Sequence, residues 1–263
     1  CEDRADVFHA RPTMLKFLRR SEGPRPLPSI GKDRRVYAIG DIHGRLDLFD
    51  QLLELIERDD ARRHPLPCHL ILLGDLVDRG PHSAEMVERA MALRDATEKV
   101  HFIKGNHEEV FVSAARGSTQ YAGNCGRIGG VQTLASYGLD VGSSERMTDE
   151  DVASWMLNHV PRSHVDFLDR FEDMLTMGDY LFVHAGIRPG LPLQAQTAAD
   201  LHWIRSEFLN HRGDHEYVVV HGHSITPKVD EKPNRVGIDT GAWSSGTLTA
   251  IGLQGTERWF LQT

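Results

Sequence analysis

Five short apolar runs in this chain of 263 residues each end in Asp, Asn or His within two residues of a glycine. Runs of this kind, bounded by glycine and polar residues, predict β-strands. In sheets of α/β proteins, ligands bind at the carboxyl ends of the strands. The repetition therefore indicates one functional site built at a shared sheet edge. The runs with their polar ends are VYAIGDIHG (36–44), HLILLGDLVDRGP (69–81), VHFIKGNHEE (100–109), YLFVHAG (180–186) and YVVVHGHS (217–224).

Three further strand patterns close the chain: RVGI (235–238), LTAIGL (248–253) and RWFL (258–261). Residues 46–58 carry apolar side chains at helical spacing, and a second helical pattern over 83–93 begins at a capping serine, Ser83. TDED (148–151) has the form of a capping box before a third helix. Strand–helix–strand order early and strands late predict an α/β fold whose sheets are covered by helices.

Composition excludes several protein classes. With 40% hydrophobic and 26% charged residues, the chain resembles a soluble globular protein, and no apolar run approaches the ~20 residues of a membrane span. Its three cysteines, Cys1, Cys68 and Cys125, form no CxxC pair, which argues against a disulfide framework or a thiolate zinc site. We expect a cytoplasmic protein in a reducing compartment, with no membrane partner. Nothing in the sequence places a base beside Cys125, so we do not expect it to be a nucleophile.

Charge is unevenly distributed. Residues 1–35 hold nine Lys/Arg and five Asp/Glu, whereas the remainder holds 21 and 33. An acidic body is a poor match for a nucleic-acid backbone, so we expect no nucleic-acid partner. The Pro- and Gly-rich segment 21–31 reads as a linker. We therefore predict a basic extension and linker over 1–35 and one domain over 36–263, with a helical cap around 109–175.

The strand ends supply ligands for metal ions. Carboxylate, imidazole and amide oxygen without thiolate suit divalent Mn, Fe or Zn. Six such residues are too many for one ion, but a carboxylate can bridge a pair of ions roughly 3.5–4 Å apart, the arrangement used in displacement at phosphorus. The candidates are Asp41, His43, Asp75, Asn106, His184 and His223.

GDIHG, GDLVDRGP, GNHE, HAG and GH, followed by IDTGA (238–242), resemble the motifs of the calcineurin-like metallophosphoesterases. Within that family the chain is most similar to the serine/threonine protein phosphatase branch, especially its compact phage and bacterial members. The resemblance extends from about Val36 to about Leu253. It implies a β-sandwich of mixed sheets flanked by helices, with a two-metal site at the carboxyl ends of the strands.

The resemblance also implies residue roles. Asp41 and His43 would bind the first metal, Asp75 would bridge both, and Asn106, His184 and His223 would bind the second, with Mn²⁺ as the leading candidate. A metal-bridging hydroxide would attack phosphorus directly. His107 would be the general acid, Asp78 would orient it, and Arg79 and Arg205 would clamp phosphate.

Several neighbouring residues have other interpretations. His221 precedes Gly222, whereas the family's ligand follows that glycine, so we expect His221 to support the site. Glu108 and Glu109 are expected to begin a helix, where acidic side chains favour the positive end. The glycine-rich segment 121–138 lacks P-loop order, and we interpret it as a helical cap that lines the substrate groove.

The substrate expectation depends on local differences between branches. Ile225 stands where many phosphodiesterases carry an additional histidine ligand, which favours a phosphomonoesterase. Asp78 and Glu108 favour a serine/threonine protein phosphatase, acting on phosphoproteins, phosphopeptides and small phosphate esters. The alternative is a symmetrical diadenosine tetraphosphatase or another nucleotide phosphohydrolase, whose closing motif SSGTL (244–248) echoes. A non-catalytic metal-binding scaffold is a further alternative. The sequence leaves the oligomeric state open.

Overall fold

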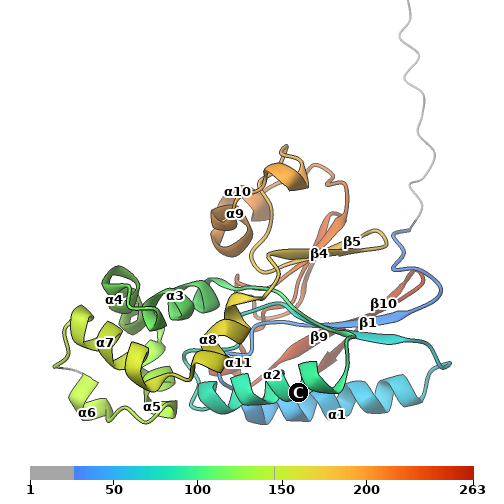
Figure 1. The fold of residues 1–263 in the computed structure, drawn as a ribbon. Coiled ribbons are helices and arrows are strands. Elements are labelled where there is room, and N and C mark those ends of the chain that lie inside the picture. Colours follow the sequence, from blue (N-terminus) through green and yellow to red (C-terminus); the bar gives the residue numbers. More distant parts are fainter. Residues whose placement is uncertain (1–26, 145) are drawn as a thin grey trace, which may run out of the picture.

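Two five-stranded sheets face one another in the computed structural model, which describes residues 27–144 and 146–263 (Figure 1). The predicted basic extension, apart from its last residues, lies outside this range. The first sheet has the order β10 (Glu257–Gln262), β9 (Thr249–Gln254), β1 (Arg35–Ile39), β2 (Cys68–Leu72), β3 (Val100–Phe102). The second has the order β4 (Met174–Met177), β5 (Tyr180–Val183), β6 (Val218–His221), β8 (Arg235–Gly237), β7 (Asp230–Glu231).

Each sheet combines three parallel strands with antiparallel neighbours. Strands β1, β2 and β3 run parallel, as do β5, β6 and β8. The antiparallel neighbours are β9 and β10 in the first sheet and β4 and β7 in the second. The parallel strands send their carboxyl ends to the same edge of each sheet, which confirms the expected α/β sandwich of mixed sheets.

Alternation along the strands produces separate cores on the two faces. In β1, Val36 and Ala38 pack between the sheets, whereas Tyr37 and Ile39 point to the outer face. From the second sheet, Phe182 joins the layer between the sheets, and the adjacent Leu181 faces outward. Helices must therefore cover both outer faces to exclude water.

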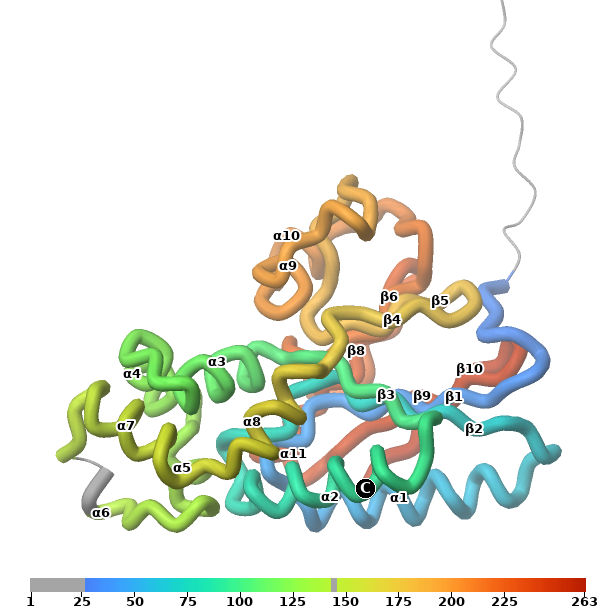
Figure 2. Tube along the Cα trace, viewed as in Figure 1, coloured from blue at the N-terminus to red at the C-terminus, as the bar shows by residue number. Residues whose placement is uncertain are grey.

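The helices do cover these faces. Helices α1 (Leu46–Ala61) and α2 (Ser83–Ala96) lie along the first sheet, and α9 (Ala198–Trp203) and α10 (Ser206–Leu209) cover the second (Figure 1). The remaining helices between β3 and β4 gather at one end of the sandwich (Figure 2). They are α3 (Asn106–Ala115), α4 (Thr119–Ile128), α5 (Gly130–Ser136), α6 (Val141–Ser144), α7 (Asp149–His159) and α8 (Arg162–Asp169).

Several local expectations are confirmed and others need correction. Thr148 caps α7 and forms the predicted capping box with Asp151. Ser83 is the first residue of α2 rather than its cap, and its buried hydroxyl serves the site described below. Strands β4 and β7 were not anticipated, because MLTM lacks polar alternation and β7 has only two residues.

The folded region begins upstream of the predicted boundary at residue 36. Ile30 is buried between the sheets, and its backbone N–H donates to Gly255. The boundary itself falls inside β1, because Arg35 belongs to the strand and pairs with Cys68 and Gln254. The predicted boundary at residue 36, which followed a segment rich in proline and glycine, is therefore several residues too late.

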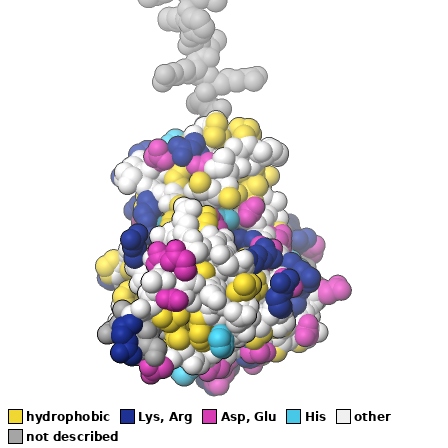
Figure 3. Space-filling model, turned by 60° about the vertical axis from the view of Figure 1, so that its left-hand side comes forward, with side chains coloured by type: hydrophobic (Ala, Val, Ile, Leu, Met, Phe, Trp, Pro, Cys, Tyr) yellow, Lys and Arg dark blue, Asp and Glu magenta, His cyan; other side chains and the backbone are white. Residues whose placement is uncertain are grey.

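Acidic, basic and hydrophobic side chains are interspersed on the face shown in Figure 3. No large surface of a single charge appears on that face. Among the described residues, no helix is long and apolar enough to cross a membrane.

Candidate metal centre

The predicted site residues lie where the strand ends of both sheets meet. Loops after β1, β2 and β3 approach from the first sheet, and loops after β5 and β6 approach from the second. Water is largely excluded, because eight of the ten predicted residues are buried. These eight are Asp41, His43, Asp75, Asp78, Asn106, His107, His184 and His223.

The backbone at these loops is strained. Among the described residues, all five non-glycine positions with a positive φ are predicted site residues. Such conformations cost of order 1–3 kcal/mol each and persist where the surrounding structure enforces them, often at functional sites. In the described chain, this kind of backbone strain occurs only in these loops. This observation does not depend on motif matching, and it marks the loops as functional. The residues are His43 (φ 50°), Asp75 (51°), Asp78 (73°), Arg79 (68°) and His223 (61°).

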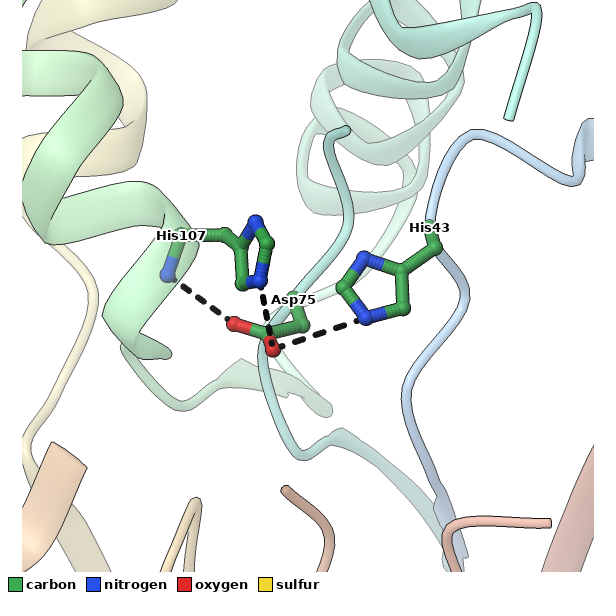
Figure 4. A group of neighbouring side chains, drawn as sticks. All are labelled: His43, Asp75 and His107. Atoms are coloured by element: carbon green, nitrogen blue, oxygen red, sulfur yellow. Dashed lines mark hydrogen bonds and ion pairs between the residues drawn. The ribbon is translucent and has the colours of Figure 1, made fainter. Parts of the chain in front are cut away.

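Asp75 lies at the centre of two possible metal-binding groups. In the first, shown in Figure 4, the Nε2 atoms of His43 and His107 lie 3.6 and 3.7 Å from Asp75 Oδ2. In the second, Asp75 groups with His184, whose Nε2 lies 3.4 Å from Oδ2, and with His223. One carboxylate shared by two groups is the geometry that a bridging ligand requires.

The remaining predicted ligands adjoin these groups. The Nε2 of His184 lies 3.0 Å from Asn106 Oδ1. The backbone N–H of His223 donates to both oxygens of Asp41, at 3.1 and 3.0 Å. All six predicted ligands are therefore brought together, although their assignment to individual ions stays a prediction.

Backbone carbonyls fix the orientation of two imidazoles. His43 Nδ1 donates to the Val77 carbonyl at 2.9 Å, and His184 Nδ1 donates to Leu73 at 2.8 Å. These bonds direct Nε2 of both rings toward the centre, the arrangement found for metal-bound histidines.

Buried polar atoms without partners test whether the site fits metal ions. The Nε2 of His223 and the Oδ2 of Asp239 are buried without a hydrogen-bond partner among the described residues. Burial lowers the pKa of His223 to about 2 and that of His43 to about 3, so both rings are neutral at pH 7 and can donate a lone pair. The residues therefore fit divalent metal ions with nitrogen and oxygen ligands; the identity of the metal stays a prediction.

Asp239 is a site residue that motif-based roles did not include. Burial, and then the neighbouring Asp239 and Asp75 carboxylates, raise the pKa of Asp41. The pKa of Asp239 is itself raised by burial. Asp239 follows β8 just as Asp41 follows β1, so the strand-end rule could have found it.

A hydrogen-bonded chain supports His107 on the side away from Asp75. His107 Nδ1 lies 2.6 Å from Asp78 Oδ2, and Thr133 Oγ1 donates to Asp78 Oδ1 at 2.6 Å. Ser83 Oγ accepts from the Asp78 backbone at 3.0 Å. Burial alone would lower the pKa of His107, but the Asp75 and Asp78 carboxylates outweigh it and raise that pKa. The arrangement can keep a proton on His107 for transfer.

Arg79 presents a guanidinium to the centre with no acidic partner among the described residues. Its Nη1 lies 3.0 Å from His43 Nε2 and its Nη2 lies 3.2 Å from His107 Nε2. Gly129 packs against this side chain, because a Cβ at Gly129 would lie 2.7 Å from Arg79 Cγ. Arg205 is exposed, and it donates to the His223 carbonyl at 3.2 Å.

Glu108 and Glu109 do begin helix α3, but each has a further role. The buried Glu108 carboxylate accepts hydrogen bonds from the backbones of Gly105, Asp75 and Leu76, at 2.7–2.9 Å, and so holds the bridging loop in place. Glu109 accepts from His202. Because Glu108 faces the backbone rather than the centre, its identity says little about substrate.

Two other predictions agree with the structure. His221 is buried and points away from the centre, with its Nε2 3.3 Å from Arg235 and its ring against Phe208. Burial raises the pKa of the Cys125 thiol, which opposes formation of a nucleophilic thiolate. Both residues are thus supports rather than reactants.

Residues 34–242 match the family model of the calcineurin-like phosphoesterases, so the chain belongs to that family. It is 29% identical over 199 residues to a symmetrical bis(5′-nucleosyl)-tetraphosphatase from Nitrosospira multiformis, covering 72% of this chain and 60% of the relative. A second symmetrical enzyme, from Delftia acidovorans, is 32% identical over 154 residues, which cover 59% of this chain and 45% of the relative. The chain therefore spans about half the length of these relatives.

A relative of more similar length carries a different name. The asymmetrical bis(5′-nucleosyl)-tetraphosphatase of Anoxybacillus flavithermus is 27% identical over 238 residues, covering 81% of this chain and 88% of the relative. These names concern nucleotide phosphohydrolases rather than the protein phosphatases that the sequence motifs favoured.

Solved structures confirm the fold. A candidate diadenosine tetraphosphatase superimposes with a TM-score of 0.59 at 20% identity, over 87% of this chain and 93% of that one. A serine/threonine phosphatase from Saccharomyces cerevisiae gives 0.52 at 15% identity, over 88% and 79%. At such identities the likeness establishes architecture and does not separate the two substrate classes.

Proposed function

We propose that this protein hydrolyses phosphoanhydride bonds in small nucleotides, with bis(5′-nucleosyl) tetraphosphates as its substrate class. The observation that carries the hydrolase proposal is the buried Asp75 carboxylate, shared by two groups of imidazoles beside an arginine that lacks an acidic partner. The nucleotide class is supported by relatives of two kinds, symmetrical and asymmetrical, which both act on this type of molecule by name.

Divalent ions held by Asp41, His43, Asp75, Asn106, His184 and His223 would activate water and offset phosphate charge. The chain's own groups do the rest. The Arg79 fork binds equatorial phosphate oxygens, for which its planar donors are suited. Asp78 fixes the His107 ring with Nε2 toward the centre. Burial of the loops limits competing water.

Attack of water breaks one phosphorus–oxygen bond of the polyphosphate and forms another. The leaving group departs as a nucleotide phosphate, which is stable as an anion, and the proton of water is released through the site. Cleavage at the middle anhydride of a tetraphosphate gives two nucleoside diphosphates, whereas cleavage at an outer one gives a triphosphate and a monophosphate. Product analysis therefore identifies the position of attack.

One observation favours a second candidate, hydrolysis of phosphoserine or phosphothreonine in proteins. The His107–Asp78 pair, at 2.6 Å, is suited to protonating a leaving group. An anhydride leaving group has little need of a proton, whereas the alkoxide of serine is a poor leaving group and depends on one.

The decisive experiment compares substrates on one preparation, stripped with EDTA and reloaded with Mn²⁺. The panel contains diadenosine tetraphosphate, ATP, p-nitrophenyl phosphate, bis(p-nitrophenyl) phosphate and a phosphoserine peptide. We expect kcat/KM for diadenosine tetraphosphate to exceed every other value by tenfold or more. A phosphopeptide value tenfold above that of the dinucleotide would instead assign the second candidate.

A further inference from the structure

Two exposed tryptophans flank the candidate centre. Trp203 and Trp243 are 39% and 42% exposed, whereas Trp155 and Trp259 are partly buried. The Trp203 ring lies 6.5 Å from the His223 ring, and the Trp243 ring lies 5.4 Å from the Arg79 guanidinium. Both exposed indoles in the described chain thus adjoin residues of the same site, one on each side of it.

A third exposed apolar side chain lies near the two tryptophans, and together the three form an apolar rim beside the centre. Ile225 is 49% exposed, and its Cγ2 would lie 3.0 Å from a Cβ placed at Gly241, two residues before Trp243. Exposed apolar surface is unfavourable in water, and its collection beside a polar centre indicates a ligand with an apolar part. Phosphate alone has no such part.

Trp203 is held in a defined orientation by a polar network. Its Nε1 donates to Glu109 at 3.1 Å, and Tyr121 approaches the same carboxylate at 3.4 Å. His202 bridges Glu109, at 2.9 Å, and Asp173, at 3.0 Å. The motif analysis gave these groups no part in the reaction. Their arrangement fixes one edge of the indole and leaves the ring partly open to solvent.

Trp243 is positioned by the short helix α11 (Ala242–Ser245). The helix follows Gly241, whose left-handed φ of 70° turns the chain, and Arg45 donates to the Ala242 carbonyl at 3.1 Å. Ala242 is buried, so the helix is anchored while the adjacent indole is exposed. The second ring is therefore also presented by the fold rather than carried on a free loop.

We propose that Trp203 and Trp243 stack against the nucleobases of a dinucleoside polyphosphate, an inference that rests on the proposed nucleotide function. A polyphosphate bound between Arg79 and the metal ligands directs its nucleosides outward, past the two indoles. Indole faces stack on any nucleobase, whatever its identity. Arg205 at the same rim adds positive charge for the phosphates. The two tryptophans thereby determine specificity for nucleotides over simple phosphate esters.

The test replaces each indole separately, as Trp203→Leu and Trp243→Leu, and also as Trp→Phe, which retains an aromatic face. Trp155→Leu, which removes an indole stacked on His159 in helix α7, is the matched control. Steady-state kinetics are measured with diadenosine tetraphosphate and with p-nitrophenyl phosphate, which lacks a base. Circular dichroism and metal content check that each variant is folded and loaded.

We expect each leucine variant to raise KM for diadenosine tetraphosphate by about tenfold or more, since one base–aromatic stack contributes on this scale. Activity on p-nitrophenyl phosphate should stay within twofold, phenylalanine should restore most of the affinity, and the control should change neither substrate. Equal losses on both substrates, or an effect at only one tryptophan, would overturn the two-platform arrangement. If the wild-type protein hydrolyses diadenosine tetraphosphate and the tryptophan variants are unaffected, the stacking role of the tryptophans is refuted while the proposed function stands. A wild-type protein inactive on it refutes the proposed function as well.

Discussion

At the scale of single residues, the centre is defined by where protons are held. The Val77 and Leu73 carbonyls accept hydrogen bonds from Nδ1 of His43 and His184, which directs both Nε2 atoms toward the centre. His107 differs, because its Nδ1 faces the Asp78 carboxylate rather than a backbone carbonyl. The hydrogen-bond partners of the three histidines thus separate two expected metal ligands, His43 and His184, from the expected general acid, His107.

His107→Asn tests this division. We expect the variant to keep its metal content but to lose kcat by about 10²–10⁴, the usual contribution of a general acid. The loss should be greater for phenyl phosphate than for p-nitrophenyl phosphate, whose leaving group needs less protonation. Kinetics with both esters and elemental analysis provide the measurement.

Asn106→Ala is the matched comparison for His107→Asn, because the neighbouring amide oxygen contacts His184. We expect it to lose metal and to reduce activity on both esters equally. If His107→Asn behaves in the same way, then His107 is a ligand together with His43 and Asp75, a grouping that the geometry also allows.

At the scale of elements, the cap shapes the site through the junction of α4 and α5. Gly129 lies at this junction with φ of 102°, and its carbonyl accepts from the Arg79 backbone. The glycine-rich segment expected to line the groove therefore reaches the site at Gly129, and again at Thr133, which bonds Asp78. Gly126 of the same segment, in contrast, has nothing within 4 Å of an added Cβ.

Gly129→Ala should therefore displace Arg79 and lower kcat/KM by about tenfold or more, with a destabilisation of about 1–2 kcal/mol from the left-handed backbone. Gly126→Ala lies inside α4 and should instead stabilise the protein by about 0.5–1 kcal/mol with unchanged activity. Urea denaturation and kinetics on both variants test the pair. Unchanged activity in Gly129→Ala would show that the helical cap does not shape the substrate site.

Asp59 connects α1 to the first sheet. Its carboxylate accepts from Tyr37 at 2.5 Å, from Arg63 at 2.9 Å and from Trp259 at 2.9 Å. Burial opposes the charge, but these donors outweigh it and lower the pKa of Asp59. A lowered folded-state pKa contributes stability above the unfolded value, and that contribution is lost as pH falls through the folded value.

We expect Asp59→Asn to destabilise the protein by about 1–2 kcal/mol at pH 7, because the charge-assisted hydrogen bonds weaken. The difference from wild type should shrink as pH falls below about 4, where Asp59 of the unfolded chain becomes protonated, and should vanish below the lowered pKa of the folded state. Urea midpoints between pH 7 and pH 3 measure it. Asp50→Asn, which removes an exposed pair with Arg89, is the control and should cost less than about 0.5 kcal/mol. A pH-independent difference would contradict the role of the Asp59 charge.

At the scale of the whole molecule, the two sheets are joined at an edge crowded with carboxylates. Asp41, Asp75 and Asp239 are all buried there, contributed by loops from both sheets. Mutual repulsion of such groups opposes folding unless protons or cations intervene. Divalent ions should therefore stabilise the entire fold as well as support reaction.

EDTA-treated protein should be inactive and should regain activity with Mn²⁺. At a metal concentration about 100-fold above Kd, binding contributes about 2.7 kcal/mol, which corresponds to a rise in Tm of about 5–10 °C for a chain of this size. Asp75→Asn should show neither recovery nor the full rise. Full activity in protein proved metal-free by elemental analysis would refute the metal-dependent mechanism.

The sequence by itself determined the fold class and predicted which residues would gather at the site, because strand ends and their Asp, Asn and His are local features. It did not reveal Asp239–Asp41 proximity, the support of Asp78 by Thr133, or the two tryptophans at the rim, since each joins segments distant along the chain. Glu108 was misleading for the same reason: its identity seemed to report on substrate, whereas the fold turns it onto the backbone of another loop. Which residues share a motif is decided locally, but which side chains face a substrate depends on how both sheets and the cap pack together.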